Sequence, residues 1–177
     1  HRKSVVQISS YGALVKSPGV FLHLIDLAWS QDPWNHEIMK KPVFLNFPKT
    51  LFSNLVIVFA KKKINNEIVG GSLFFRDKKN LYGRYWGCHE EYDCLHFECC
   101  YYQGIEYCIN NNLEKFDPGV QGEHKIKRGF SPTETFSAHW IADDRFREAI
   151  DDFVLREEKH INHYLEDAKR LLPFKTV

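Results

Sequence analysis

Residues 116–130, with the sequence FDPGVQGEHKIKRGF, bring several side chains that could carry out chemistry close together in the chain. Gly119 and Gly122 allow the backbone to turn tightly or to approach a ligand closely. Around the second glycine stand an amide, a carboxylate, an imidazole and an ammonium group, from Gln121, Glu123, His124 and Lys125. Such groups serve proton transfer or anion binding. A solvated turn followed by a polar helix is the alternative interpretation, and these residues alone favour neither.

Residues 95–112 (LHFECCYYQGIEYCINNN) predict a helix that is apolar on two sides, so other elements must cover both. Glu98 falls within its apolar stripe, and a carboxylate on a buried face must be paired, hydrogen-bonded or protonated. Glu98 is therefore a candidate catalytic group, and the alternative is an internal salt bridge to Arg84 or Arg128. Gly104 weakens the middle of this helix and indicates the close approach of a strand or a ligand.

The segment 81–88 (LYGRYWGC) predicts a strand with one unusual face. Tyr82, Arg84 and Trp86 alternate with their neighbours and therefore share one side of the strand. An arginine between two aromatic rings indicates either stacking inside the protein or a strip that faces a ligand, and both remain open. His139 lies beside a tryptophan in another strand pattern, where a histidine is more often a structural group than a catalyst.

The remaining strand patterns predict an antiparallel meander. Residues 55–60 (LVIVFA) form the continuous apolar run of a strand buried on both faces. Turn residues separate this run from two further strands at 68–75 and 81–88. Further strand patterns follow the central helix at 114–120 and 133–141, and a weak alternating stretch precedes the meander at 4–8.

Apolar spacing predicts three more helices. The first covers residues 21–30, a short second one begins near Pro48, and a long third one runs to about Leu172. Asp143 and Asp144 cap this terminal helix. Its core side is expected to contain Phe146, Ile150, Phe153 or Val154, Ile161 and Tyr164.

Composition narrows the classes of function. The 177 residues fit one domain with its own core, and the net charge of +1 argues against a global attraction to nucleic acid or an anionic membrane. Five cysteines without C-x-x-C spacing indicate reduced thiols and a cytoplasmic location. A zinc site made of His96, Cys99 and Cys100 would have only part of a ligand shell. No apolar run or signal peptide predicts membrane insertion.

The order of meander, helix and further strand resembles that of the GNAT acyltransferase fold. Four blocks of sequence also resemble the signature blocks of the FemAB-like, GNAT-related proteins, some of which are labelled for peptidoglycan biosynthesis or recognition. These blocks are LYGRYWGC at 81–88, LHFECCYYQGIEYCI at 95–109, FDPGVQGEHKIKRGF at 116–130 and SAHWIADDRFREAI at 137–150. The resemblance extends over about residues 20–174 and matches the C-terminal, GNAT-like half of such proteins.

The resemblance implies an α/β (α+β) fold with a mixed twisted sheet, an antiparallel meander, a central crossover helix and a C-terminal helix. We expect one GNAT-like domain over residues 1–177. Residues 1–20 would be a linker or the remnant of a preceding domain, because the chain starts with His1 and corresponds to one half of a two-domain protein.

For function, the resemblance implies an N-acyl or aminoacyl transferase that acts on an amine, such as that of a peptidoglycan precursor or a peptide. The donor would be acyl-CoA or aminoacyl-tRNA, with a tRNA contact in the second case, and the partner would be a missing N-terminal domain or a second copy in a homodimer. No other cofactor and no metal is expected. The alternative is a non-catalytic module that recognises a cell-wall peptide or a nucleotide-sugar.

The pyrophosphate loop of ordinary GNAT enzymes has the pattern Q/R-x-x-G-x-G/A and would fall between Gly87 and Leu95 in this chain. The sequence there, GCHEEYDCL, lacks the pattern and is acidic, and its charge would repel a pyrophosphate. We therefore expect weak or no binding of acetyl-CoA.

The predicted site combines the two chemical segments. Glu98 or Glu123 would act as the base, with His124 as the other proton carrier. The groups that would bind donor and acceptor are Arg84, Trp86, Tyr101, Tyr102, Gln121, Lys125, Arg128 and His139. If the strands at 81–88 and 114–120 are parallel neighbours, Glu98 should meet residues 121–125 at one edge of the sheet, with Arg84 and Trp86 in the same cleft. The competing prediction is a closed salt-bridge network of Glu98, Glu123, Arg84 and Arg128.

Overall fold

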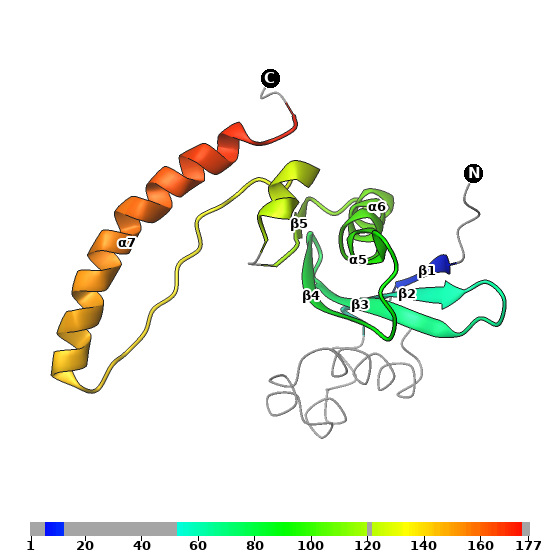
Figure 1. Cartoon of the computed structure of the whole chain (residues 1–177), viewed down its shortest axis with the longest axis horizontal. Coiled ribbons are helices and arrows are strands. Elements are labelled where there is room, and N and C mark those ends of the chain that lie inside the picture. Colours follow the sequence, from blue (N-terminus) through cyan, green and yellow to red (C-terminus); the bar gives the residue numbers. More distant parts are fainter. Residues whose placement is uncertain (1–5, 13–52, 120–121, 175–177) are drawn as a thin grey trace. The chain divides into compact units, whose positions relative to one another are not determined.

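The computed structural model describes residues 6–12, 53–119 and 122–174 (Figure 1). The chain divides into two units, residues 1–119 and residues 120–177, and each is described by itself. The described part of the first unit contains one sheet whose strands lie in the order of the sequence. These strands are β1 (Val6–Gly12), β2 (Leu55–Lys62), β3 (Ile68–Arg76), β4 (Asn80–Cys88) and β5 (Lys115–Asp117).

The antiparallel meander predicted from the sequence is confirmed. β2 pairs with β3, and β3 with β4, each in the antiparallel sense, and β1 pairs antiparallel with β2 on its other side. All residues of the run 55–60 are buried, as expected of an apolar strand covered on both faces. Asp77 closes the turn between β3 and β4, because its Oδ1 accepts hydrogen bonds from the backbone N–H groups of Lys79 and Asn80 at 2.7 Å.

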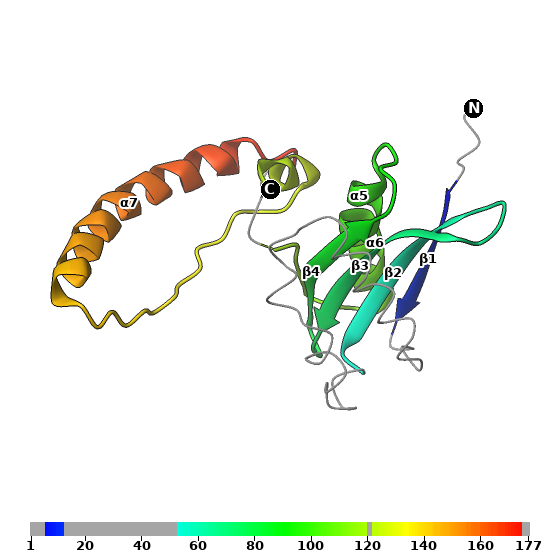
Figure 2. The same ribbon diagram turned by 60° about the horizontal axis from the view of Figure 1, so that its bottom comes forward.

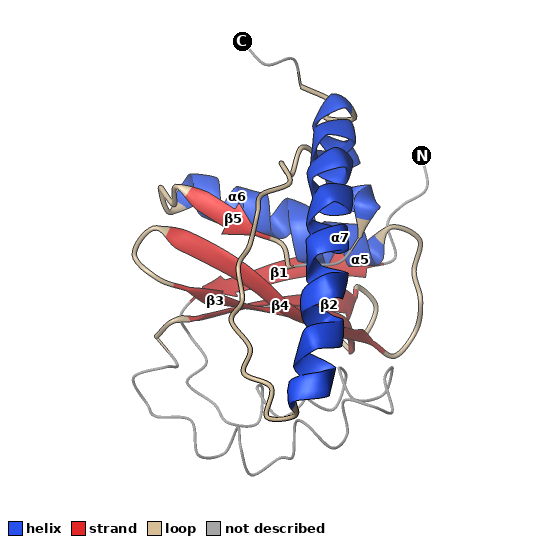
Figure 3. Ribbon diagram, turned by 90° about the vertical axis from the view of Figure 1, so that its left-hand side faces the viewer, coloured by secondary structure: helices blue, strands red, loops and turns tan. Residues whose placement is uncertain are grey.

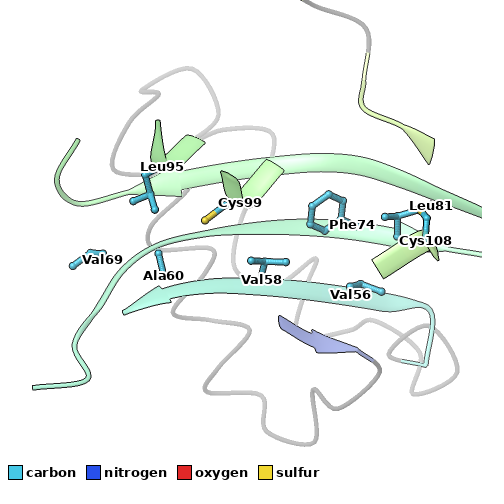
Figure 4. Close-up of a cluster of buried hydrophobic side chains, with 9 residues drawn as sticks. All are labelled: Val56, Val58, Ala60, Val69, Phe74, Leu81, Leu95, Cys99 and Cys108. Atoms are coloured by element: carbon cyan, nitrogen blue, oxygen red, sulfur yellow. The ribbon is translucent and has the colours of Figure 1, made fainter. Parts of the chain in front are cut away.

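The central helix consists of three consecutive parts, α5 (Leu95–Phe97), the π-helical turn η1 (Glu98–Tyr102) and α6 (Gln103–Asn110). They lie over one face of the sheet (Figure 2). A core cluster joins the two layers (Figure 4), and its members are Val56, Val58, Ala60, Val69, Phe74, Leu81, Leu95, Cys99 and Cys108. The helix predicted at 95–112 is thus confirmed, with a wider turn in its first half.

The crossover between β4 and β5 is also confirmed. The two strands are parallel neighbours, with Asn80 opposite Lys115, Leu81 opposite Phe116 and Tyr82 opposite Asp117. Gly104 is the point of closest approach between this crossover helix and β5. A Cβ atom on Gly104 would lie 2.5 Å from the Phe116 ring, so the predicted close approach is that of a strand residue.

The second unit contains the 3₁₀ helix η2 (Glu123–Arg128) and the long helix α7 (Asp144–Arg170), which is drawn in blue in Figure 3. Asp143 caps α7 as predicted, because its Oδ1 accepts hydrogen bonds from the backbone N–H groups of Arg145 and Phe146 at 3.0 and 3.2 Å. Phe174 packs against Gly129, whose φ of +90° lies in the left-handed region.

Two predictions for this second unit are wrong. Residues 133–141 form no strand, although they alternate, because none of the described strands pairs with them and the segment is exposed. The buried residues of α7 are Leu165 and Ala168, whereas five of those predicted for its core side are exposed, namely Phe146, Phe153, Val154, Ile161 and Tyr164. Apolar spacing identifies the side of a helix that can be buried, but a second element must cover it.

Of the other predicted helices and strands, one is found and two lie outside the described residues. β1 overlaps the weak alternating stretch predicted at 4–8. The helices predicted at 21–30 and near Pro48 lie outside the described residues. Within the described ranges, no helix combines the length and the apolar character needed to cross a membrane.

Candidate functional site

The sheet opens between β4 and β5. β5 pairs only with the first three residues of β4, and residues 83–88 of β4 continue with β3 on one side and no described strand on the other. The ladder between β3 and β4 also shifts by one residue at this point, because Phe74 is opposite Gly83 and Leu73 is opposite Tyr85, which leaves Arg84 as a β-bulge. Bulges and the carboxyl ends of strands at such an opening are frequent locations of ligand sites.

The bulge corrects the predicted face of this strand. Leu81 and Trp86 both pack with the core cluster beneath the central helix, although they are five positions apart and would lie on opposite faces of a regular strand. Trp86 therefore faces the helix, whereas the Tyr82 hydroxyl donates to Asp77 Oδ2 at 3.0 Å and the Arg84 guanidinium lies 5.6 Å from the neighbouring Tyr85 ring. The predicted strip of Tyr82, Arg84 and Trp86 on one face is wrong, because the bulge inserts one residue and reverses the alternation.

An aromatic group forms where β4 meets the start of the central helix. The His96 ring lies 5.5 Å from Trp86, 5.4 Å from Phe97 and 5.5 Å from Tyr101, measured between ring centroids. Trp86 and Tyr101, both predicted to shape a cleft, thus each lie beside the His96 ring. His96 was not predicted as a site residue, because helical spacing places it on a polar strip of the helix. The one feature of the sequence that could have indicated its aromatic surroundings is the neighbouring Phe97.

Glu98 is the first residue of η1 and is half-buried. Its Oε1 accepts a hydrogen bond from Gln103 Nε2 at 3.0 Å. Within the described part of residues 1–119 Glu98 forms no ion pair, so the predicted salt bridge to Arg84 is absent there, whereas the one to Arg128, in the second unit, stays a prediction. Tyr102, at the other end of η1, is 47% exposed. Glu98 therefore presents a carboxylate that a neutral amide orients.

The segment 122–129 holds the second set of predicted residues. Gly122 has a φ of +108° and the His124 ring packs against it, so glycine is needed for both the conformation and the space. The Arg128 Nη1 donates to the His124 carbonyl at 2.8 Å. Burial, together with the positive charges of Lys125 and Arg128, lowers the pKa of His124 below its usual 6.5. The imidazole is accordingly neutral at pH 7 and can accept a proton.

The loop 89–94, where a pyrophosphate loop would lie, has fixed negative charge. Lys62 Nζ lies 3.3 Å from Glu67 and 3.4 Å from Glu90, and the Tyr92 hydroxyl donates to Glu90 at 2.5 Å. The hydrogen bond from Tyr92 and the charge of Lys62 lower the pKa of Glu90. Lys62, which pairs with Glu90 of this loop, is thus engaged by two carboxylates.

The cysteines of the described residues differ in burial: Cys88, Cys99 and Cys108 are buried, Cys100 is half-buried and Cys94 is exposed. No disulfide joins any two of the five cysteines within the described residues, and Cys99 packs in the core cluster. Burial, with a smaller contribution from the charge of Glu98, raises the pKa of Cys99 to about 12. The described part of the chain contains no group of three His, Cys, Asp or Glu side chains that could hold a metal ion.

The remaining predicted residues fall into three groups. Glu123 and Lys125 lie in η2, exposed and buried respectively. Gln121 lies outside the described residues, and the exposed His139 bonds to Ser137 Oγ at 2.9 Å through Nε2. Because Glu98 belongs to residues 1–119 and Glu123 to residues 120–177, their meeting at one edge of the sheet stays a prediction.

Comparison with known proteins places the chain in a wider context. Residues 19–176 match the model of the FemAB-like family, described as peptidoglycan biosynthesis/recognition. No curated protein matches the sequence.

Solved structures resemble the chain in fold, at TM-scores of 0.51 to 0.52. An aminoglycoside acetyltransferase from an uncultured soil metagenomic sample, in complex with sisomicin, is 14% identical over 78% of this chain and 96% of its own, with a TM-score of 0.51. A possible acetyltransferase from Clostridium difficile 630 is 9% identical over 78% and 99%, with a TM-score of 0.52. The aminoglycoside N-acetyltransferase AAC(6')-Iy in complex with CoA is 10% identical over 78% and 95%, with a TM-score of 0.52. The fold is therefore that of the GNAT acyltransferases, as the sequence predicted.

Proposed function

Because the chain belongs to the FemAB-like family, we propose that it transfers an acyl or aminoacyl group to an amine, with the amine of a peptidoglycan precursor or a peptide as the acceptor. The observation that carries the proposal is the opening of the sheet beside the bulge at Arg84, with the Glu98 carboxylate at the start of the helix that follows β4. This arrangement offers a place for an extended donor and a proton acceptor close to it.

The reaction needs a proton acceptor and donors for the oxyanion from the chain. A lone pair on the acceptor nitrogen attacks the acyl carbon, and the new C–N bond forms as the C–S bond of a thioester or the C–O bond of an ester breaks. We assign the nitrogen's proton to the Glu98 carboxylate, while the leaving thiolate or alkoxide takes up a proton. Backbone N–H groups of residues 83–88 of β4, on the side where no described strand pairs with them, would stabilise the oxyanion of the tetrahedral intermediate.

Glu123 and His124 remain candidates for proton transfer within the same proposal. The lowered pKa of His124 suits it to accept a proton at neutral pH. Arg84, Lys125 and Arg128 would bind an anionic donor or an acceptor carboxylate, and Trp86, Tyr101 and Tyr102 would shape the cleft. Gln121 and His139 are retained as weaker candidates for binding the acceptor.

Two donors fit the proposal differently. Acyl-CoA is supported by the GNAT fold, and AAC(6')-Iy is one protein of this fold solved with CoA. The acidic loop 89–94 argues against a pyrophosphate held in the usual place, which favours an aminoacyl ester such as aminoacyl-tRNA. Aminoacyl-tRNA would add a tRNA contact, and a preceding domain or a second copy would complete the binding surface. Five cysteines without a disulfide among the described residues favour a reducing compartment such as the cytoplasm.

The test is a transfer assay on the 177-residue chain with acyl-CoA or aminoacyl-tRNA as the donor and nucleotide-sugar peptides as acceptors, read by the mass of the product. We expect transfer that Glu98→Gln lowers by about a hundredfold or more, because general base catalysis contributes roughly that much. Calorimetry is expected to show weak or no binding of CoA.

The outcomes separate the two classes of function. A chain that binds a cell-wall peptide equally well before and after Glu98→Gln, and turns over none of the donors, is a binding module. Tight CoA binding would show that the acidic loop does not exclude a pyrophosphate.

A further inference from the structure

Two pairs of side chains meet across η1 although they are five residues apart in the chain. Gln103 Nε2 donates to Glu98 Oε1 at 3.0 Å, and the rings of His96 and Tyr101 lie 5.5 Å apart. In an α-helix, side chains five residues apart point about 140° away from each other, whereas those three or four apart are neighbours. In the wide turn the Gln103 N–H donates to the Glu98 carbonyl, five residues earlier, so side chains five residues apart come to lie on the same side of the helix. Both contacts therefore depend on the π-helical geometry.

Ser72 connects this wide turn to the sheet. Its side chain, in β3, is 1% exposed, and its Oγ donates to the Cys99 carbonyl at 2.8 Å. A hydroxyl on a buried apolar face is costly without a hydrogen bond, so this bond fixes where the turn lies along β3. Trp86 is the neighbour of Ser72 on β4 and contacts His96 from the same side of the sheet.

We propose that Ser72 and Gln103 are positioning residues for Glu98, in that Ser72 fixes the π-helical turn and the Gln103 amide orients the carboxylate that the turn presents. The inference rests on the proposed role of Glu98 as proton acceptor. π-helical turns occur frequently at functional sites. Gln103 is neutral and therefore orients Glu98 without cancelling its charge. Among the described residues no other group hydrogen-bonds this carboxylate, so its second oxygen is available to the acceptor amine.

Glu106 fixes the other side of the same amide. Gln103 Nε2 also donates to Glu106 Oε2 at 3.3 Å, so the two N–H bonds of one amide connect two carboxylates along the helix. The two hydrogen bonds restrict the Gln103 amide to one orientation, in which its nitrogen faces Glu98. A purely structural role for the turn would require the packing of Cys99 and Tyr101 but neither of these hydrogen bonds.

The first experiment needs no substrate. Side-chain amide NMR of the 177-residue chain would follow Gln103, identified by the signals lost in Gln103→Leu. In Ser72→Ala we expect these signals to move toward those of exposed amides, and in Ser72→Thr, which keeps the hydroxyl, to stay in place. Asn110→Leu, on the exposed side of the same helix, is the matched control. Unchanged Gln103 signals in Ser72→Ala would overturn the role of Ser72. If Ser72→Ala does not fold, Ser72→Cys, with a weaker donor of similar size, gives the same comparison.

The second experiment measures the coupling to Glu98 in the transfer assay. Gln103→Leu should lower kcat by roughly tenfold to a hundredfold and change the KM for the donor by less than about threefold, because it disturbs orientation and not donor binding. In the Glu98→Gln background the same change should have no further effect. An equal loss in both backgrounds would overturn the role of Gln103. An absence of turnover in the unaltered chain would contradict the proposed function instead, and the NMR result would still decide whether Ser72 and Gln103 order the turn.

Discussion

Burial and local hydrogen bonds determine which ionisable residues of this chain can take part in chemistry. Cys99 is fully buried and keeps its proton, so its thiol is a packing group. Asp77 has a lowered pKa because Asn80 and the turn backbone donate to it, which makes it a turn residue that stays ionised. Glu98 differs from both, because it is half-buried and accepts a hydrogen bond from the Gln103 amide. These environments separate structural acids and thiols from the candidate base.

The lowered pKa of His124 predicts a pH dependence of stability. The unfolded chain binds the proton more readily than the folded one, so the free energy of unfolding should fall as the pH drops below about 6.5. His124→Gln should remove this part of the dependence. NMR titration should place the midpoint of His124 below 6.5, and Lys125→Gln should raise it by removing one positive charge. A midpoint at or above 6.5 would contradict the burial of this imidazole.

At the scale of the elements, the central helix carries both the core and the candidate base. Its buried side supplies Leu95, Cys99 and Cys108 to the core cluster between helix and sheet, while η1 presents Glu98. The helix follows β4 directly, and the opening between β4 and β5 begins one residue after their pairing ends. The crossover therefore places the start of the helix beside the open part of β4, in the way that α/β sheets commonly form ligand sites.

Gly104→Ala should destabilise the chain although alanine is the better helix former. The added methyl group would lie 2.5 Å from the Phe116 ring and 3.3 Å from Phe74, both held in the packing between helix and sheet. Overpacking of this kind costs about 1–3 kcal/mol, more than the roughly 1 kcal/mol gained in helix propensity. Denaturant unfolding would measure the difference.

Asn110→Ala is the control for this substitution, because Asn110 is exposed near the end of the same helix. It should leave the free energy of unfolding unchanged or raise it slightly. A stabilised Gly104→Ala variant would show that β5 can move away from the helix without loss.

At the scale of the whole chain, the first and second units are built differently. The described part of residues 1–119 contains a sheet, a helix and a common core. Within residues 120–177, α7 buries only Leu165 and Ala168, and the residues before it are extended and exposed. Aromatic side chains such as Phe136 and Trp140 stand in this extended stretch at 90% and 84% exposure.

Limited proteolysis should reveal this difference. Chymotrypsin is expected to cut first after Phe136 or Trp140, because extended and exposed segments are the preferred sites of proteolytic cleavage. Mass spectrometry would then find one fragment that contains the sheet and one that contains α7. The double variant Phe136→Ser, Trp140→Ser should lose this early cleavage. Resistance of the unaltered chain at both residues would show that another surface covers the segment.

Much of the fold follows from local patterns in the sequence. The buried run at 55–60, the turn residues after it and the two further strand patterns predict the meander, because each strand's alternation and each turn's chemistry are local properties. The parallel pairing of β4 and β5 follows from the connection through a helix, which has few alternatives in a compact sheet. The resemblance to the FemAB-like blocks adds the fold class. For the site, the sequence proposes Glu98 as a base and Trp86 and Tyr101 as cleft residues, and these roles stay predictions.

Tertiary packing decided two irregularities, a bulge and a wide helical turn, which the two-residue period of strands and the 3.6-residue period of helices cannot show. One extra residue at Arg84 turns Trp86 toward the helix, and a wide turn after Phe97 brings Gln103 to Glu98. Both are shifts by a single residue that leave composition and average spacing almost unchanged, so only the fit of strand against helix determines them. The segment 133–141 shows the same limit of sequence patterns. Its residues alternate as in a strand, but they form none because no described strand pairs with them. The sequence by itself determined the order and type of β2, β3, β4, the central helix and β5, and the contacts between these elements decided which side chains face one another.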